Sequence, residues 1–344
     1  MRVAIVNDLK LAVEVLRQSL QRIPGAEVAW IAEDGREAIA KCAADRPDLV
    51  LMDMQMPVMD GAVATREIMR STPCPIVVVT ASITANLDRV YDALGAGALD
   101  VTTTPTFARD GSIEGLDALA RKIDHVRQLD LGHAVGGHAV GGHAAGPAEV
   151  THPSCRGSGI IAIGASTGGP QALAQALPRG MDLPVPVVIV QHIDRAFAPG
   201  LAEWLGRETG HPVVLAEEGS TPTTGTIHIA CSDDHLVLVD GRFTHRAEPR
   251  ALAHRPSVDV FFGSLVGSPC GVAVLLTGMG RDGAEGLRAL RRAGWHTIAQ
   301  DEATSVVWGM PGAAVALGAA IEVVPIQRIA QAIGIACATP RSAR

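Results

Sequence analysis

Short runs of apolar, β-branched residues alternate with helical periodicity along the first third of the chain. The runs at 2–6, 48–52 and 76–79 each suit a buried strand, and a polar residue follows each of them. Between the first two runs, apolar residues such as Leu11 and Val15 recur at helical spacing. Alternating strands and helices predict a doubly wound parallel sheet, in a flavodoxin-like α/β domain.

The second half of the chain repeats this pattern. Apolar runs at 160–163, 185–190 and 271–276 are predicted to be further buried strands. The first of them leads through Gly-Ala-Ser-Thr-Gly-Gly to Pro170, a residue type that suits the first turn of a helix. We therefore expect a second α/β domain with a mostly parallel sheet.

Three polar residues follow the strands of this second domain. Ser166 lies at the strand-to-helix corner, His192 just past the second strand, and Asp282 in the glycine-rich corner after the third. The carboxyl ends of parallel strands share one edge of a sheet, so these side chains are expected to lie together. A serine nucleophile needs a base and a group that orients the base. The order Ser, His, Asp differs from the Ser, Asp, His order of α/β-hydrolases.

The glycines around the serine allow two interpretations. Gly164, Ser166 and Gly168 satisfy G-x-S-x-G, in which small neighbours let a strained turn expose the hydroxyl. A glycine-rich loop before a helix can equally hold a phosphate, which would indicate a nucleotide-binding enzyme. The loop has neither the P-loop lysine nor the third glycine of G-x-G-x-x-G, and both absences disfavour nucleotide binding.

Several motifs in order resemble the catalytic domain of the chemotaxis response-regulator protein-glutamate methylesterases, over about residues 157–337. They are GASTGG at 164–169, QH at 191–192, HRPSVD at 254–259, LTGMGRDGA at 276–284 and QDEATSVVWGMP at 300–311. The resemblance implies hydrolysis of γ-glutamyl methyl esters on the cytoplasmic helices of methyl-accepting chemoreceptors, with release of methanol. Some members of the family also deamidate receptor glutamines.

The resemblance also implies roles for individual residues. The nucleophile of the family falls on Ser166, its base on His192 and its orienting carboxylate on Asp282. Thr167 and Met279 correspond to positions that line the active site, and the backbone N–H of Met279 is expected to bind the oxyanion. The esterase chemistry needs no cofactor.

The polar residues at the strand ends of the first domain suit phosphoryl acceptance. Asp53 would accept the phosphoryl group, and Asp8, Asp53 and the backbone carbonyl of Gln55 could supply oxygen ligands for Mg²⁺. MDMQMPVMDG at 52–61 resembles the loop after the phosphoacceptor of response-regulator receivers, and Thr80 matches their phosphoryl-binding hydroxyl. The resemblance implies phosphorylation by a CheA-type histidine kinase.

The chain departs from the common receiver pattern at three positions. Asn7 replaces one of two adjacent acids, Thr104 replaces a lysine, and Val101 occupies an aromatic position. A site with one charge fewer should bind Mg²⁺ more weakly. These changes leave open a receiver that serves only for docking, and the opening IVNDLKLAVEVLRQ resembles the WspF-like subgroup, which serves surface-sensing pathways controlling a diguanylate cyclase.

A low-complexity stretch separates the two halves. Gly-His-Ala-Val-Gly recurs over 132–146, which predicts a flexible linker between a receiver at 1–125 and a methylesterase domain at 157–344, with 126–156 as the linker. Its histidines His133, His138 and His143 are not expected to form a metal site, because ordering a glycine-rich chain costs much entropy.

Composition narrows the class of partner. A net charge of −7 without a basic stripe disfavours nucleic-acid binding. The six cysteines form no C-x-x-C pair, and the sequence has neither a signal peptide nor a run that could span a bilayer, so a cytoplasmic protein without direct membrane insertion is expected.

A non-catalytic adaptor with two docking domains remains the alternative to an enzyme. The histidines outside the triad are expected to be structural or on the surface, namely His228, His235, His254 and His296.

Overall fold

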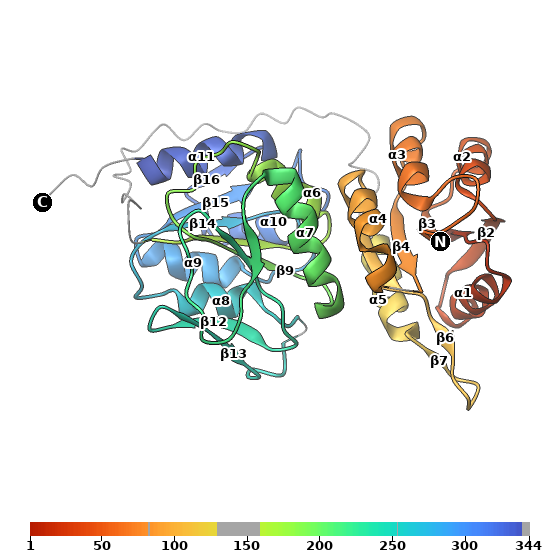
Figure 1. Cartoon of the computed structure of the whole chain (residues 1–344), viewed down its shortest axis with the longest axis horizontal. Helices are drawn as coiled ribbons and strands as arrows, with labels where there is room; N and C mark the ends of the chain where they lie inside the picture. Colours follow the sequence, from red (N-terminus) through yellow and green to blue (C-terminus); the bar gives the residue numbers. More distant parts are fainter. Residues whose placement is uncertain (82, 129–158, 253, 339–344) are drawn as a thin grey trace, which may run out of the picture.

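The computed structural model describes residues 1–81, 83–128, 159–252 and 254–338, which form two α/β domains (Figure 1). The predicted linker histidines lie outside the described residues, as does most of the predicted linker. Within the described residues, no helix is long and apolar enough to cross a membrane.

The N-terminal domain is a five-stranded parallel sheet with the order β2-β1-β3-β4-β5, which confirms the doubly wound prediction. Its strands are β1 (Arg2–Val6), β2 (Glu27–Ala32), β3 (Leu49–Met52), β4 (Ile76–Thr80) and β5 (Asp100–Thr103). Its helices are α1 (Lys10–Arg22), α2 (Gly35–Ala44), α3 (Gly61–Ser71), α4 (Ile83–Gly95) and α5 (Leu116–Gln128), and a small hairpin, β6 (Thr106–Phe107) and β7 (Ile113–Glu114), precedes α5. Helix α5 therefore continues past residue 125, the predicted domain boundary.

Alternate residues of each strand in this sheet pack on opposite faces. Val3 and Ile5 belong to a buried cluster with α1 and α5, whereas Ala4 and Val6 belong to a cluster with α2, α3 and α4. Both faces are therefore covered, as a parallel sheet of apolar strands requires.

The C-terminal domain contains a seven-stranded parallel sheet with the order β10-β11-β9-β8-β14-β15-β16. Its strands are β8 (Ile161–Ala165), β9 (Val187–Gln191), β10 (Val213–Leu215), β11 (Ile227–Ile229), β14 (Val272–Leu275), β15 (His296–Gln300) and β16 (Glu322–Val324). Helices α6 (Gly169–Ala176), α7 (Ala198–Thr209) and α11 (Ile326–Ala338) pack on one face, and α8 (Val258–Ser264), α9 (Ala284–Arg292) and α10 (Met310–Ala316) pack on the other. A hairpin of β12 (His235–Val239) and β13 (Arg242–Arg246) and a 3₁₀ turn, η1 (Arg195–Phe197), complete the domain.

The two domains meet where α4 lies against α7 (Figure 1). The Tyr91 ring stacks on Trp204 at a centroid distance of 6.0 Å, and the Tyr91 hydroxyl donates a 2.7 Å hydrogen bond to the carbonyl of Phe197. An ion pair of 2.7 Å joins Arg207 to Asp88 at the edge. One buried apolar cluster thus continues from the first sheet through α4 into α6 and α7.

Candidate active site

Ser166 lies in the turn between β8 and α6, at the carboxyl edge of the second sheet. Its backbone N–H donates to the carbonyl of Thr277, which follows β14. Gly168 then adopts a φ of 74°, a left-handed conformation that glycine takes without strain, and α6 begins. A Cβ at Gly278 would lie 2.7 Å from the Ser166 Cβ, so the chain can pass this close to the serine only with glycine there.

His192 follows β9, the strand beside β8. Its backbone N–H donates to the carbonyl of Ala165, which places His192 next to Ser166 across the two strand ends. The ring is buried and its Nε2 lies 2.7 Å from Oδ2 of Asp282. The other ring nitrogen, Nδ1, is buried and has no hydrogen-bond partner among the described residues.

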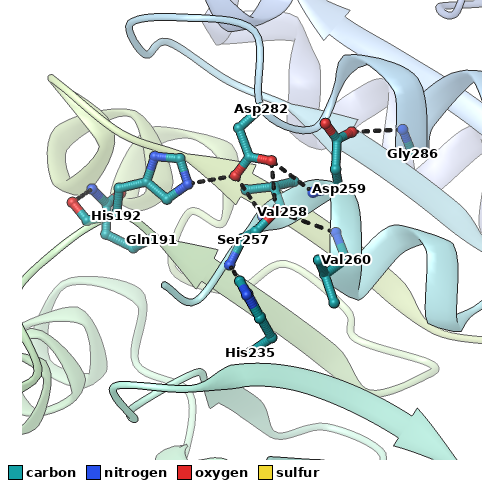
Figure 2. A network of polar contacts seen from close by, with 9 residues as sticks. All are labelled: Gln191, His192, His235, Ser257, Val258, Asp259, Val260, Asp282 and Gly286. Carbon is teal, nitrogen blue, oxygen red and sulfur yellow. Dashed lines mark hydrogen bonds and ion pairs between the residues drawn. The ribbon is translucent and has the colours of Figure 1, made fainter. Parts of the chain in front are cut away.

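Asp282 receives four polar contacts, two on each oxygen (Figure 2). Oδ2 contacts His192 Nε2 and accepts from Val258 N at 2.7 Å. Oδ1 accepts from the Ser257 hydroxyl at 2.7 Å and from Asp259 N at 3.0 Å. Burial alone would raise the pKa of Asp282, but the hydrogen bond and attraction to His192, with the donors of Asp259 and Ser257, hold it well below its usual value.

An ionised Asp282 fixes the tautomer of its partner. A carboxylate only accepts hydrogen bonds, so the neutral His192 ring carries its proton on Nε2 and its lone pair on Nδ1. In the arrangement found here, Nδ1 is therefore the nitrogen that can accept a proton. The Ser166 hydroxyl makes no hydrogen bond among the described residues, so the structure joins His192 to Asp282 but does not join Ser166 to His192.

The support for Asp282 comes from the HRPSVD motif, to which the sequence assigned no role. Ser257 caps α8, since its hydroxyl accepts from Val260 N, and its own N–H donates to Nδ1 of His235. Asp259 in turn accepts from Gly286 N of α9 at 2.6 Å (Figure 2). The start of α8 thus holds Asp282, and the Asp259 side chain from the same turn holds the start of α9.

Thr167 and Met279 flank the serine in two different loops. Thr167 is buried and directly follows Ser166, and Met279 is half-buried in the loop between β14 and α9. Within the described part of the chain, neither backbone N–H has a hydrogen-bond acceptor.

The N-terminal domain contacts the turn that carries Ser166 directly. The carbonyl of Leu99, just before β5, accepts a 3.2 Å hydrogen bond from the backbone N–H of Gly168. The N-terminal domain therefore bonds to Gly168, which is two positions after Ser166 in the chain.

A second polar site lies at the carboxyl edge of the first sheet. Asp53 follows β3, is 6% exposed, and accepts a hydrogen bond from Gln55 N at 3.2 Å. Burial first, and the negative charge of Asp8 in addition, raise the pKa of Asp53 to about 6. A divalent cation would relieve the repulsion between the Asp53 and Asp8 carboxylates. The backbone carbonyl of Gln55 would add a third oxygen ligand, so these residues fit Mg²⁺. No group of three or more His, Cys, Asp or Glu side chains suited to a metal occurs among the described residues.

Of the three residues that depart from the receiver pattern, two follow strands at the carboxyl edge of this sheet, Asn7 after β1 and Thr104 after β5. The Asn7 side-chain oxygen accepts from Leu9 N at 2.8 Å, which is a local backbone role. Thr104 donates its N–H to the carbonyl of Thr80, and its buried hydroxyl has no partner among the described residues. Val101 is buried in the core.

Replacing Asp53 by asparagine is expected to stabilise the N-terminal domain at neutral pH. The folded-state pKa is the higher one, so the stability of the wild type should fall as pH rises from about 4 to about 6 and stay low above that. The raised pKa of Asp53 corresponds to roughly 3 kcal/mol at most in the free energy of unfolding. The difference in stability between the variant and the wild type should vanish below about pH 4. Urea unfolding in EDTA across this pH range measures it, with exposed Asp92→Asn as the control. A variant that is no more stable than the wild type at pH 7 would contradict this electrostatic picture.

Comparison with known proteins adds independent information on both domains. Residues 161–333 match the CheB methylesterase family, and residues 3–109 match the response regulator receiver domain family. The chain is 48% identical over 334 residues to protein-glutamate methylesterase/protein-glutamine glutaminase 4 of Burkholderia thailandensis, covering 96% of both chains. It is 46% identical to the enzyme of this name from the group 3 operon of Pseudomonas putida, covering 96% of this chain and 97% of that one. The crystal structure of the Thermotoga maritima CheB methylesterase catalytic domain is similar at 34% identity and a TM-score of 0.50, over 52% of this chain and 99% of that chain.

Proposed function

Because the chain belongs to the CheB methylesterase family, we propose that it hydrolyses γ-glutamyl methyl esters on methyl-accepting chemoreceptors, at a rate controlled by phosphorylation of Asp53. The observation that carries the proposal is the buried contact of His192 with Asp282, which leaves Nδ1 without a partner beside the strand-end Ser166. The names of the relatives, protein-glutamate methylesterase/protein-glutamine glutaminase, support the glutamyl ester as substrate and the glutamine amide as a second substrate.

Each residue has a chemical role in this reaction. Ser166 Oγ forms a bond to the ester carbonyl carbon while His192 Nδ1 takes the hydroxyl proton. The backbone N–H groups of Met279 and Thr167 stabilise the negative oxygen. Methanol leaves with the proton from Nδ1. Nδ1 then deprotonates a water molecule that attacks the acyl-serine, and it returns this proton to Ser166 Oγ as the bond to the glutamate carboxyl group breaks. Asp282 holds the imidazolium throughout and remains ionised.

The contact between the domains supports control by the receiver. Leu99 of the receiver bonds to the turn that carries Ser166, and α4 covers α7 beside it. A chemoreceptor helix that approached Ser166 from this side would meet the receiver, so access over this surface would require the receiver to move. Docked and undocked states would then exchange, and only the undocked state would be active.

Phosphorylation of Asp53 provides the signal that shifts this equilibrium. Asp8, Asp53 and the Gln55 carbonyl would hold Mg²⁺, which offsets the charge of the incoming phosphoryl group. Thr80 would bind a phosphoryl oxygen, and a CheA-type histidine kinase would be the donor.

The proposed reaction is tested with receptor fragments that carry isotopically labelled glutamyl methyl esters. The full-length protein should release labelled methanol and leave glutamate. A folded protein that releases no methanol, with or without kinase, ATP and Mg²⁺, would leave the adaptor as the better explanation.

Replacing Gly200 by alanine is expected to raise the basal rate without kinase. The new Cβ on α7 would lie 2.7 Å from the Leu87 side chain and 2.9 Å from Tyr91, both on α4, so the domains must separate slightly. Overpacking costs about 1–3 kcal/mol, which would weaken docking about 5- to 150-fold. Gly206→Ala on the same helix is the matched control, since its Cβ would make only ordinary contacts at 3.6 Å. Equal basal rates in the two variants would contradict the inhibitory role of the docked receiver.

A further inference from the structure

His254 stacks flat on the ring of His192. The two ring centroids are 4.1 Å apart and the planes differ by only 9°. His254 begins the HRPSVD motif, whose Ser257, Val258 and Asp259 donate to Asp282. One six-residue segment thus contacts both the imidazole and the carboxylate.

We propose that His254 is a positioning residue that fixes the plane of the His192 ring by stacking on it. The proposal rests on the proposed function, in which His192 Nδ1 moves the proton. The Nε2 contact to Asp282 fixes one point of the imidazole, but the ring can still tilt about that point. A parallel ring on one face restricts this tilt and so keeps Nδ1 directed at one place.

The geometry excludes direct proton transfer between His254 and His192. Hydrogen bonds of an imidazole lie in the plane of the ring, and stacked parallel rings present only their faces to each other. His254 makes no hydrogen bond to any described residue, so it neither relays a proton to His192 nor orients it through a polar contact.

The charge of His254 suits this position. Burial first, and then the positive charge of His192, lower the pKa of His254 to about 4. Lys122 and His125 on α5 act in the same direction, and Asp282 acts against them. His254 is therefore neutral near pH 7, and the face of a neutral ring can stabilise the imidazolium that forms on His192, whereas a second cation would repel it.

The test compares side chains at position 254 in the full-length protein, with release of methanol from a peptide bearing a glutamyl γ-methyl ester as the assay. Phenylalanine keeps a flat ring, leucine has an apolar side chain without one, and alanine removes the contact. His254→Phe should keep kcat within about threefold of the wild type, whereas His254→Leu and His254→Ala should lose about 10- to 100-fold in kcat with little change in KM. His245→Ala on β13 is the control and should be unaffected.

A spectroscopic measurement separates positioning from general stability. In protein labelled with ¹⁵N-histidine, His192 should keep its proton on Nε2 in both proteins, because Asp282 fixes the tautomer. The ring resonances of His192 should be narrow in the wild type and broadened by exchange between ring orientations in His254→Leu. A leucine variant as active as the phenylalanine variant, or a His192 signal unchanged in the leucine variant, would overturn the proposal. Failure of the proposed function is a different result, because the wild type itself would then be inactive or Ser166→Ala would be active.

Discussion

Replacing Ser166 by alanine is expected to lower kcat for methyl ester hydrolysis by on the order of a million-fold. The loss is this large because no acyl intermediate can form without the hydroxyl, and the remaining groups supply only binding and oxyanion stabilisation. The substitution should leave the fold intact, since the Ser166 hydroxyl makes no hydrogen bond within the described residues.

The control for Ser166→Ala is the same substitution at a serine outside the proposed active site. Ser220→Ala removes a hydroxyl that bonds only to the Glu217 carbonyl in a remote turn, and it should retain full activity. Thermal unfolding of both variants checks that they are folded. Substantial methanol release by folded Ser166→Ala protein would show that another group is the nucleophile.

Replacing Asp282 by asparagine is expected to cost about 10⁴-fold in kcat. The donors of Ser257 and Asp259 both bond to Oδ1 and favour the amide oxygen at that position. The amide NH₂ group then takes the position of Oδ2, where it faces His192 Nε2 and also loses the hydrogen bond from Val258 N. Two N–H groups cannot face each other, so the imidazole would carry its proton on Nδ1 and could no longer act as a base there.

Kinetics and ¹⁵N spectra of this variant provide the measurement. The His192 signals should change to the tautomer with the proton on Nδ1 while KM changes little. Asp233→Asn, at an exposed position that forms an ion pair with Arg195, is the control. An Asp282→Asn variant with nearly normal kcat would contradict the assignment of Nδ1 as the base.

Most of the fold could be predicted because its strands are continuous apolar runs. The runs at 2–6 and 76–79 became β1 and β4, and the run at 271–276 became the slightly shorter β14. The grouping of Ser166 with His192 and Asp282 at one sheet edge followed from a general property of parallel sheets, which requires no knowledge of side-chain packing.

The support around the His192 and Asp282 pair could not be predicted in the same way. His254 and Ser257 lie in a loop without periodicity, and their places depend on how α8 packs beside α9. The motif that contains them was visible in the sequence, but a motif in a loop does not reveal which groups it contacts. His254 was expected to be structural or on the surface, and the structure places it on His192.

The contact between the domains was also beyond the sequence pattern. Tyr91 and Trp204 lie on amphipathic helices, and an apolar helix face predicts burial without naming its partner. Asn7 illustrates the same limit at the Asp53 site, because its side-chain oxygen bonds to Leu9 N, a contact that residue type alone does not specify.

The central claim is that phosphorylation of Asp53 controls hydrolysis at Ser166. The most direct test measures methanol release from methyl-labelled chemoreceptor by the full-length protein, together with phosphoryl label on the protein, before and after addition of CheA-type kinase, ATP and Mg²⁺. The wild type should take up label and its rate should rise, while Asp53→Asn should take up none and stay at the basal rate. A wild type that is labelled at Asp53 and shows no change in rate, or an Asp53→Asn protein that is stimulated equally, would contradict it.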